Sequence, residues 1–157
     1  MNENDRRLLR RAVQVSKDAK AHGNHPFGAV LANAAGDVVL EAENTVTTSG
    51  DCTGHAETNL VRLASTTIPR SELLSHTLYT SCEPCAMCSG AIYWVGIGRV
   101  VYALAETGLL ALTGSHPDNP TLAHPCRLVF AGGQRETEVS GPHLEEEAAD
   151  PHRGFWD

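Results

Sequence analysis

Lysine is the scarcest charged residue of this 157-residue chain. Only Lys17 and Lys20 are present, and 19 acidic residues outnumber 12 basic ones, which gives a formal net charge of −7. Proteins that bind long nucleic acids usually carry a basic face that neutralises phosphates. The one basic cluster here, four arginines between residues 6 and 11, has the spacing of a solvated helix face. The composition therefore disfavours a DNA or long RNA substrate.

Long apolar runs are also missing from the chain. No stretch of about 18 apolar residues occurs, so we predict no membrane-spanning helix. Residues 1–7 are mostly polar and charged, and no apolar signal region follows them. These features favour a cytoplasmic location.

The cysteine count argues against a disulfide framework. There are five cysteines, an odd number in a chain without an export signal. Cys85 and Cys88 form a C-x-x-C pair at the spacing that metal sites use. Cys52 and Cys126 are expected to be ordinary buried or half-buried thiols. Cys82, three residues before the pair, is a further candidate for a metal ligand.

The hydrophobic pattern predicts helices and strands in one domain that covers residues 1–157. We expect helices over residues 5–22, 55–65, 84–95 and 143–149, with Thr53 as the N-cap of the second. We expect strands over residues 27–32, 38–42, 77–80, 99–103 and 127–130, and an irregular loop over 113–120. Helices then cover both faces of one sheet, which makes the fold class α/β, a three-layer α/β/α sandwich.

Three residues of the chain are predicted to bind a metal. His55, Cys85 and Cys88 are zinc-binding residue types at the predicted starts of two helices. Cysteines three apart on a helix face the same side, and helix N-termini stabilise the thiolate form that binds zinc. A structural zinc site normally has four protein ligands, whereas a catalytic site keeps one position for water. We therefore predict one catalytic Zn²⁺ per chain; a structural site needs a fourth ligand, for which Cys82 is the best candidate.

Glu57 is the predicted catalytic residue. It lies two residues after His55 on a helix, so its carboxylate does not point in the same direction as the imidazole. Zinc lowers the pKa of a bound water to about 7, and Glu57 is placed to take that proton and deliver it to a substrate. The alternative is a non-catalytic, zinc-stabilised interaction domain in which Glu57 has no chemical role.

The two motifs together indicate a family. His55-Ala56-Glu57 followed by Pro84-Cys85-Ala86-Met87-Cys88 is the signature of the zinc-dependent nucleobase deaminases. With the segments at 26–29, 44–49, 79–83 and 90–94, the chain resembles the cytidine deaminase-like superfamily, and within it the bacterial guanine deaminase and cytosine deaminase branch. The resemblance implies a central five-stranded mixed sheet and hydrolytic release of ammonia from a free aminated base. Guanine is the first expected substrate, then cytosine, modified bases and amino-triazines. A tRNA adenosine deaminase, which shares both motifs, is the remaining enzymatic alternative.

The same resemblance implies substrate contacts at matching positions. Asn44 would hydrogen-bond a polar edge of the ring, and Phe27 would pack near it. Ala56 would line the substrate site, and Glu83 would contribute backbone contacts beside the leaving amine. The ordinary alternatives are a turn residue for Asn44, a core side chain for Phe27 and a solvated carboxylate for Glu83.

Oligomeric state and the C-terminus also follow from the resemblance. Family members are usually homodimers, and in guanine deaminases a C-terminal segment covers an active site, often that of the neighbouring subunit. Residues 143–157 are predicted to close the site in this way, with Phe155, Trp156 and Asp157 reaching the substrate. Asp157 is the acid expected to meet an exocyclic amine. The alternative is docking of the aromatic pair onto the core.

The acid that guanine deaminases of this branch carry after the fourth strand, thought to help move protons, is harder to place. Between Thr107 and Arg135 the chain has one carboxylate, Asp118, in a proline-rich loop. We expect Asp118 or its neighbour His116 to contact the substrate instead; a solvent-exposed loop histidine is the alternative for His116. The sequence thus predicts the type of reaction more firmly than the identity of the substrate ring.

Overall fold

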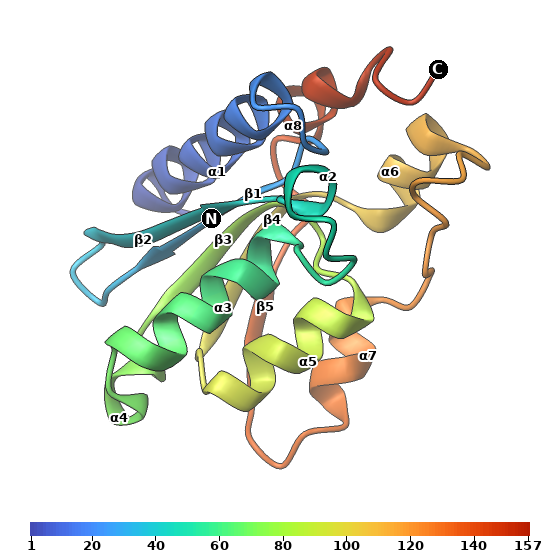
Figure 1. Cartoon of the computed structure of the whole chain (residues 1–157). Helices are drawn as coiled ribbons and strands as arrows, with labels where there is room; N and C mark the ends of the chain where they lie inside the picture. The colour runs from blue at the N-terminus through green and yellow to red at the C-terminus, as the bar shows by residue number, and fades with distance from the viewer.

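The computed structural model describes residues 1–157 as one five-stranded sheet with helices on both faces (Figure 1). The strands are β1 (Gly28–Ala32), β2 (Val38–Glu43), β3 (Thr77–Cys82), β4 (Arg99–Leu104) and β5 (Glu138–Ser140). They lie in the order β2-β1-β3-β4-β5. Strand β1 is antiparallel to β2 and β3, whereas β3, β4 and β5 are parallel, so the sheet is mixed as expected.

The helices form a layer on each face of the sheet. Helices α1 and α8 cover one face, and α3, α5 and α7 cover the other (Figure 1). This is the predicted three-layer α/β/α sandwich. The helix bounds are α1 (Glu3–Ala21), α2 (Val46–Ser49), α3 (Ala56–Thr67), α4 (Arg70–Leu73), α5 (Ala86–Val95), α6 (Glu106–Thr113), α7 (Cys126–Ala131) and α8 (Glu145–Ala149), followed by a 3-10 turn η1 (Asp150–His152).

Strand β1 contributes to the core on both sides of the sheet. Successive side chains of a strand point to opposite faces. Accordingly, Val30 and Ala32 join the apolar cluster under α1, while Ala29 and Leu31 join the cluster under α3 and α5. Helix α1 packs so closely that a Cβ on Gly28 would lie 2.5 Å from the backbone of α1. A glycine is therefore required where β1 begins, directly after Phe27.

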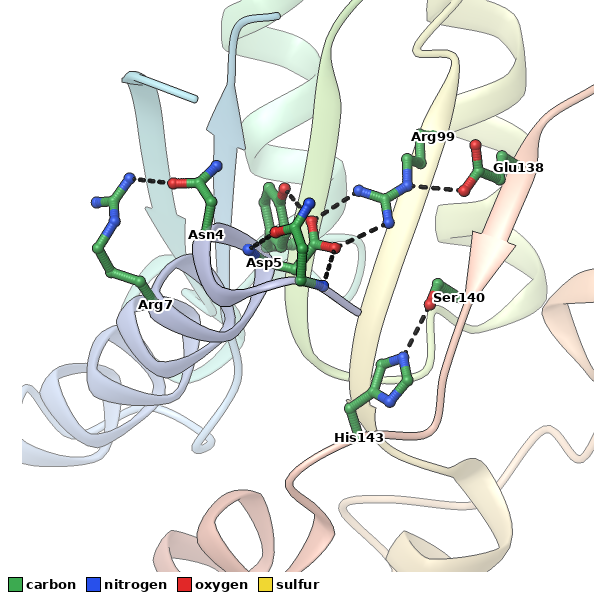
Figure 2. Close-up of polar contacts among 9 residues, drawn as sticks. Asn4, Asp5, Arg7, Arg99, Glu138, Ser140 and His143 are labelled. Atoms are coloured by element: carbon green, nitrogen blue, oxygen red, sulfur yellow. Dashed lines mark hydrogen bonds and ion pairs between the residues drawn. The ribbon is translucent and has the colours of Figure 1, made fainter. Parts of the chain in front are cut away.

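A buried ion pair joins the start of α1 to the sheet. The Asp5 side chain is 3% exposed, and its carboxylate accepts hydrogen bonds from the Arg99 guanidinium at 2.7 and 3.1 Å and from the Tyr79 hydroxyl at 2.8 Å. Asp5 also forms a capping box with Asn2 at the N-terminus of α1. Arg99 reaches Glu138 on β5 at 2.9 Å (Figure 2). One carboxylate therefore fixes α1 against β3 and β4, and Arg99 extends the network to the edge strand.

The predicted strand at residues 127–130 is wrong, because these residues lie in helix α7. The buried residues there are Cys126 and Phe130, four apart, which is the spacing of a helix face. The fifth strand is instead β5, which pairs in parallel with β4. Helices α2, α4 and α6 were also not predicted, and α6 ends at Thr113, the first residue of the expected 113–120 loop. Thr53 does not cap α3, because His55 holds the N-cap position and the Thr53 hydroxyl donates to Asp51.

The helices of this chain could cross a bilayer only if they were long and predominantly apolar. None of them combines the length and the apolar character that a membrane crossing demands. The longest, α1, has charged residues along its whole length. The cytoplasmic location stays a prediction.

We predict that Arg99→Gln lowers the free energy of unfolding by about 3 kcal/mol at pH 7, because it leaves a buried carboxylate without its charged partner. The Arg99 guanidinium holds the pKa of Asp5 well below its ordinary value. This stabilisation is therefore fully present above the unfolded pKa and declines as the pH falls below about 4. Urea unfolding at pH 7 and pH 3 measures both effects.

The matched control is Arg10→Gln, which removes only the exposed pair with Glu147 and should change stability by less than about 1 kcal/mol. Equal losses for the two variants at pH 7 would contradict the prediction. A loss for Arg99→Gln that is as large at pH 3 as at pH 7 would contradict the assigned charge interaction.

Candidate functional site: a three-ligand metal centre

The metal ligands lie where helices α3 and α5 begin. His55 is the N-cap of α3, Cys85 is the N-cap of α5, and Cys88 is buried in the first turn of α5. The two helices pack against each other on the same face of the sheet (Figure 1). Their N-termini meet at the edge where β3 ends at Cys82. Both helices therefore begin one or two residues later than predicted, at Ala56 and Ala86, and the ligands lie at the helix starts as expected.

The three ligand atoms have the separations of a zinc site. The Nδ1 atom of His55 lies 3.6 Å from Cys85 Sγ and 3.6 Å from Cys88 Sγ, and all three atoms are within 4.8 Å of one another. A tetrahedral ion with Zn–S of about 2.3 Å and Zn–N of about 2.0–2.1 Å separates its N and S ligands by roughly 3.6 Å. Hydrogen bonds with Cys88 and His55 lower the pKa of Cys85 to about 4, so this cysteine is a thiolate. The residues thus fit zinc without rearrangement.

The other cysteines do not join this group. Cys82 is buried, and its Sγ lies 3.5 Å from Nε2 of His152, away from the three ligands. Cys126 is buried, as expected. Cys52 is exposed and lies beside the site, so the prediction of a buried or half-buried thiol is wrong for it. With Cys82 engaged elsewhere, the centre has three protein ligands.

Glu57 lies beside the metal ligands and outside their group. It is 5% exposed, and the Thr80 hydroxyl donates a hydrogen bond to its Oε1 atom at 2.6 Å. Burial raises the pKa of Glu57, and the hydrogen bond from Thr80 opposes this shift. The fixed carboxylate therefore binds a proton more readily than an exposed glutamate does.

A cavity of about 380 Å³ opens in front of the metal ligands. It contains four carboxyl groups and no lysine or arginine. This size is at the low end of the roughly 300–1,000 Å³ typical of small-molecule sites. The lining residues are His25, Phe27, Asn44, Val46, Cys52, His55, Glu57, Cys82, Glu83, Cys85, Met87, Glu106, Leu109, Asp118, Asn119, Pro120, Thr121 and Leu122.

Asn44 presents a hydrogen-bond donor to the cavity. Its side chain is almost fully buried, and its Oδ1 atom accepts from the Val46 N–H at 3.0 Å. Its backbone N–H donates to the carbonyl of Phe27 at 3.1 Å, which places it beside the half-buried Phe27 ring on the same wall. The Asn44 side-chain NH₂ group is left without a partner in the chain. Asn44 is thus both a turn residue and a donor for a ligand.

The Glu83 side chain lines the cavity and holds its outer loop, so the solvated alternative is wrong. One carboxylate oxygen accepts from the Glu106 N–H at 3.1 Å, and the other accepts from the Cys126 N–H at 3.0 Å. These two N–H groups belong to the first residues of α6 and α7. One side chain therefore fixes both ends of the segment that includes residues 118–122 of the cavity lining.

Glu106 supplies the carboxylate after the fourth strand. Strand β4 ends at Leu104, and Glu106 lies two residues later in the cavity lining. Burial, with the negative charge of Cys85 as the second cause, raises the pKa of Glu106 to about 7. Of the two residues expected in this role, Asp118 is exposed and lines the cavity rim. His116 lies outside the lining, where its Nδ1 accepts from the Asp118 N–H at 3.2 Å.

The C-terminal tail packs against its own chain. The Trp156 indole N–H donates to Nδ1 of His152 at 3.2 Å, and its ring meets those of His25 at 5.0 Å and His116 at 5.5 Å. His152 is buried, its pKa is lowered to about 4 by that burial, and its ring packs on Phe27. Trp156 therefore packs behind the residues that line the cavity. Exchange of the tail between two subunits stays a prediction.

Four predicted substrate contacts lie outside the cavity lining in addition to His116. Ala56 is fully buried at the start of α3, and Trp156 is buried behind the wall. Phe155 is half-buried and Asp157 is exposed. Substrate contact by these residues stays a prediction.

Among the lining residues that the sequence did not predict, Glu106 and His25 carry ionisable side chains on which the function can depend. Glu106 lies one residue before the Thr107–Arg135 window, and predicting the end of β4 correctly would have revealed it. His25 directly precedes the Pro26-Phe27 motif, so its position beside that motif was the available signal.

Comparisons with known proteins agree with this geometry. The chain is similar over all 157 residues to a probable cytosine deaminase of Schizosaccharomyces pombe, with 43% identity and 95% of that protein covered. It is 36% identical over 105 residues to a tRNA-specific adenosine deaminase of Haemophilus influenzae, which covers 67% of the chain and 61% of that enzyme. The solved structure of guanine deaminase from Bacillus subtilis superposes with a TM-score of 0.66 at 32% identity, covering 96% of this chain and 91% of that one.

The family assignment rests on the segment that holds the ligands. The family model for the cytidine and deoxycytidylate deaminase zinc-binding region matches residues 2–104, which include His55, Glu57, Cys85 and Cys88. The match spans the strands and helices that converge on the metal site. The chain therefore belongs to this family of zinc-dependent deaminases.

Proposed function

We propose that the protein hydrolytically deaminates a free amino-nucleobase. The observation that carries the proposal is the placement of buried Glu57 in the cavity beside a centre with three protein ligands. A centre that only stabilises a fold normally has four protein ligands. A proton-binding carboxylate beside an incomplete ligand set instead favours catalysis with water.

The chain supplies the proton transfers of this reaction. His55, Cys85 and Cys88 would hold the zinc ion, which would supply a water molecule of lowered pKa. Glu57 takes the proton from that water as its oxygen bonds to the amine-bearing ring carbon, and passes the proton to the adjacent ring nitrogen. The proton of the newly added hydroxyl then goes to the amine, the C–N bond breaks, and ammonia leaves as the hydroxyl oxygen becomes a ring carbonyl. Thr80 keeps Glu57 aimed at the cavity through its 2.6 Å hydrogen bond.

Two further residues act on the substrate in this proposal. The unpaired NH₂ group of Asn44 donates to a ring carbonyl, which both cytosine and guanine carry. Glu106, with a pKa of about 7, exchanges a proton with the departing amine. Its position in the lining and after β4 supports this role.

Cytosine is the substrate we favour, and guanine is the second candidate. The similarity to the probable cytosine deaminase extends through the cavity loop and the tail, whereas the family model ends at residue 104. Guanine is favoured by Glu106, the acid after the fourth strand that the resemblance to guanine deaminases implies. A lining without lysine or arginine gives no partner for a phosphate, which argues against nucleotides and tRNA.

We predict that ammonia is released from cytosine or guanine and that Glu57→Gln lowers kcat about 10³-fold, because the variant no longer accepts a proton. Ammonia release is measured over a panel of cytosine, guanine, their nucleosides, adenosine and an amino-triazine. Zinc content, measured by plasma mass spectrometry, should be unchanged, and the exposed Glu72→Gln serves as control. Equal rates of ammonia release by wild type and Glu57→Gln would contradict the proposal.

We predict that Glu106→Gln lowers kcat at least about tenfold and yet stabilises the fold. A carboxyl group whose pKa rises from 4.5 to about 7 on folding destabilises the folded state as the pH rises through that range. Removing it should raise the free energy of unfolding by about 1 kcal/mol at pH 8, after allowance for solvent screening, and leave it unchanged at pH 4.

Urea unfolding at the two pH values and steady-state kinetics test both parts of this prediction. The exposed Glu136→Gln is the matched control and should change neither quantity. Full activity of Glu106→Gln would remove the proton-transfer role. A lower stability at pH 8 would show that the carboxylate is structural.

We propose further that the protein is a homodimer, as the family resemblance implies. Met87 and Trp94 are seven residues apart on α5, and Trp94 is 74% exposed. Leu128 on the adjacent helix α7 is 59% exposed. Exposed apolar side chains on neighbouring helices are typical of an interface. Because Met87 also lines the cavity, a partner on this face would border the active site.

Sedimentation equilibrium tests the dimer. We expect a mass of twice the 16.8 kDa chain for wild type and a single-chain mass for Trp94→Glu, since a charge is costly to bury. Leu74→Glu, at an exposed leucine that follows α4, should leave the mass of the dimer unchanged. A wild-type monomer at micromolar concentration would contradict the proposal.

A further inference from the structure

His25 faces the cavity with no assigned task. It precedes Pro26 and Phe27 at the entrance to β1, is half-buried, and lines the cavity. Its carbonyl accepts from the Phe27 N–H at 2.8 Å, which fixes the backbone. Neither ring nitrogen has a hydrogen-bond partner in the chain. A half-buried imidazole without a partner is able to bind a polar group of a ligand.

The C-terminal tail holds this imidazole in place. Trp156 meets the His25 ring at 5.0 Å with an angle of 67° between the ring planes, and Phe155 meets it at 5.9 Å and 75°. Trp156 is itself fixed, because its N–H donates to Nδ1 of buried His152. With Nδ1 accepting, the neutral His152 ring carries its proton on Nε2, which faces Cys82 Sγ at 3.5 Å. The orientation of His25 is therefore set before a ligand binds.

The His25 ring is a hydrogen-bond acceptor at neutral pH. Burial lowers the pKa of the His25 ring, and the carboxylate of Asp118 opposes this shift. A neutral imidazole has one N–H donor and one nitrogen acceptor. His25 thus adds an acceptor to a wall on which Asn44 offers a donor.

Asn44 and His25 both line the cavity, and the backbone of each is hydrogen-bonded to Phe27. The Asn44 N–H donates to the Phe27 carbonyl, and the Phe27 N–H donates to the His25 carbonyl. A donor and an acceptor in one lining match a ring carbonyl and the ring N–H beside it. Cytosine has this pair at its C2 carbonyl and N1–H, and in cytidine the sugar replaces the N1 proton.

We propose that His25 is a specificity-determining residue that accepts a hydrogen bond from the ring N–H of a free base and so selects bases over their nucleosides, and that Trp156 is its positioning residue. The inference rests on the proposed binding of an amino-base in this cavity. It assigns the tail a role in specificity that requires no contact between the tail and the substrate.

The test compares cytosine with 1-methylcytosine, in which a methyl group replaces the N1 proton. The ratio of their kcat/KM values is measured for wild type, His25→Ala and His25→Gln, with His22→Ala, an exposed histidine three residues earlier, as the matched control. The ratio of their Kd values is measured by calorimetry in the Glu57→Gln background, which does not depend on turnover. Zinc content and circular dichroism verify that each variant is folded.

We expect wild type to prefer cytosine over 1-methylcytosine. His25→Ala should reduce this preference about tenfold, which corresponds to the loss of one hydrogen bond. The loss should appear in KM, with kcat for cytosine little changed. His25→Gln should retain part of the preference, because its amide oxygen accepts a hydrogen bond. Trp156→Leu should resemble His25→Ala, while Trp156→Phe, which keeps a ring against His25, should restore much of the preference. His22→Ala should match wild type.

The inference is overturned if His25→Ala keeps the wild-type preference for cytosine over 1-methylcytosine. It is also overturned if wild type binds neither compound, or binds and converts the two equally well. An unchanged preference in Trp156→Leu removes the positioning role of the tail. Preferential binding in the Glu57→Gln background without any ammonia release by wild type would instead reject the proposed reaction and leave the role of His25 in place.

Discussion

The site depends on two helices beginning at the same point. Helices α3 and α5 bury Leu60 and Ile92 in one apolar cluster on the same face of the sheet, and this packing fixes their axes. Each helix then offers its N-cap residue to the metal, His55 from α3 and Cys85 from α5. Because an N-terminus also favours a thiolate, the helices provide both the position and the charge state of their ligands. The hydrophobic core thus determines the 3.6 Å separations between the ligand atoms.

The two lysines explain how the tail is held. Lys17 lies 3.4 Å from Asp150, and Lys20 donates to the Pro151 carbonyl at 2.9 Å and lies 5.6 Å from the centre of the Phe155 ring. Helix α1 therefore uses every lysine of the chain on the C-terminal segment. The tail docks on its own chain behind the cavity wall, and closure of the site by residues 143–157 stays a prediction.

Much of the site was predictable because its chemistry is local in sequence. The ligand spacing and the carboxylate two residues after His55 identify the centre before any fold is known, and four strands follow from apolar runs bounded by turn residues. The errors occur where tertiary contacts decide. The apolar run at 127–130 suits a strand, but Glu83 accepts from the N–H of Cys126 and favours the start of a helix there. Strand β5 has three residues and depends on β4 for its pairing, so no periodicity marks it. His25 belongs to the cavity only because residues more than 100 positions later pack behind it.

The attachment of the cavity loop has an evolutionary consequence. The two oxygens of Glu83 hold the first residue of α6 and the first residue of α7, and most residues of the connection between these helices (114–125) are exposed. Loops of this kind tolerate insertions and substitutions far better than the elements they connect. Its length and sequence are therefore free to diverge while Glu83 keeps both helix starts, and the metal ligands beside them, in place. A lineage with this arrangement can change the ring that it accepts without rebuilding the centre that removes the amine.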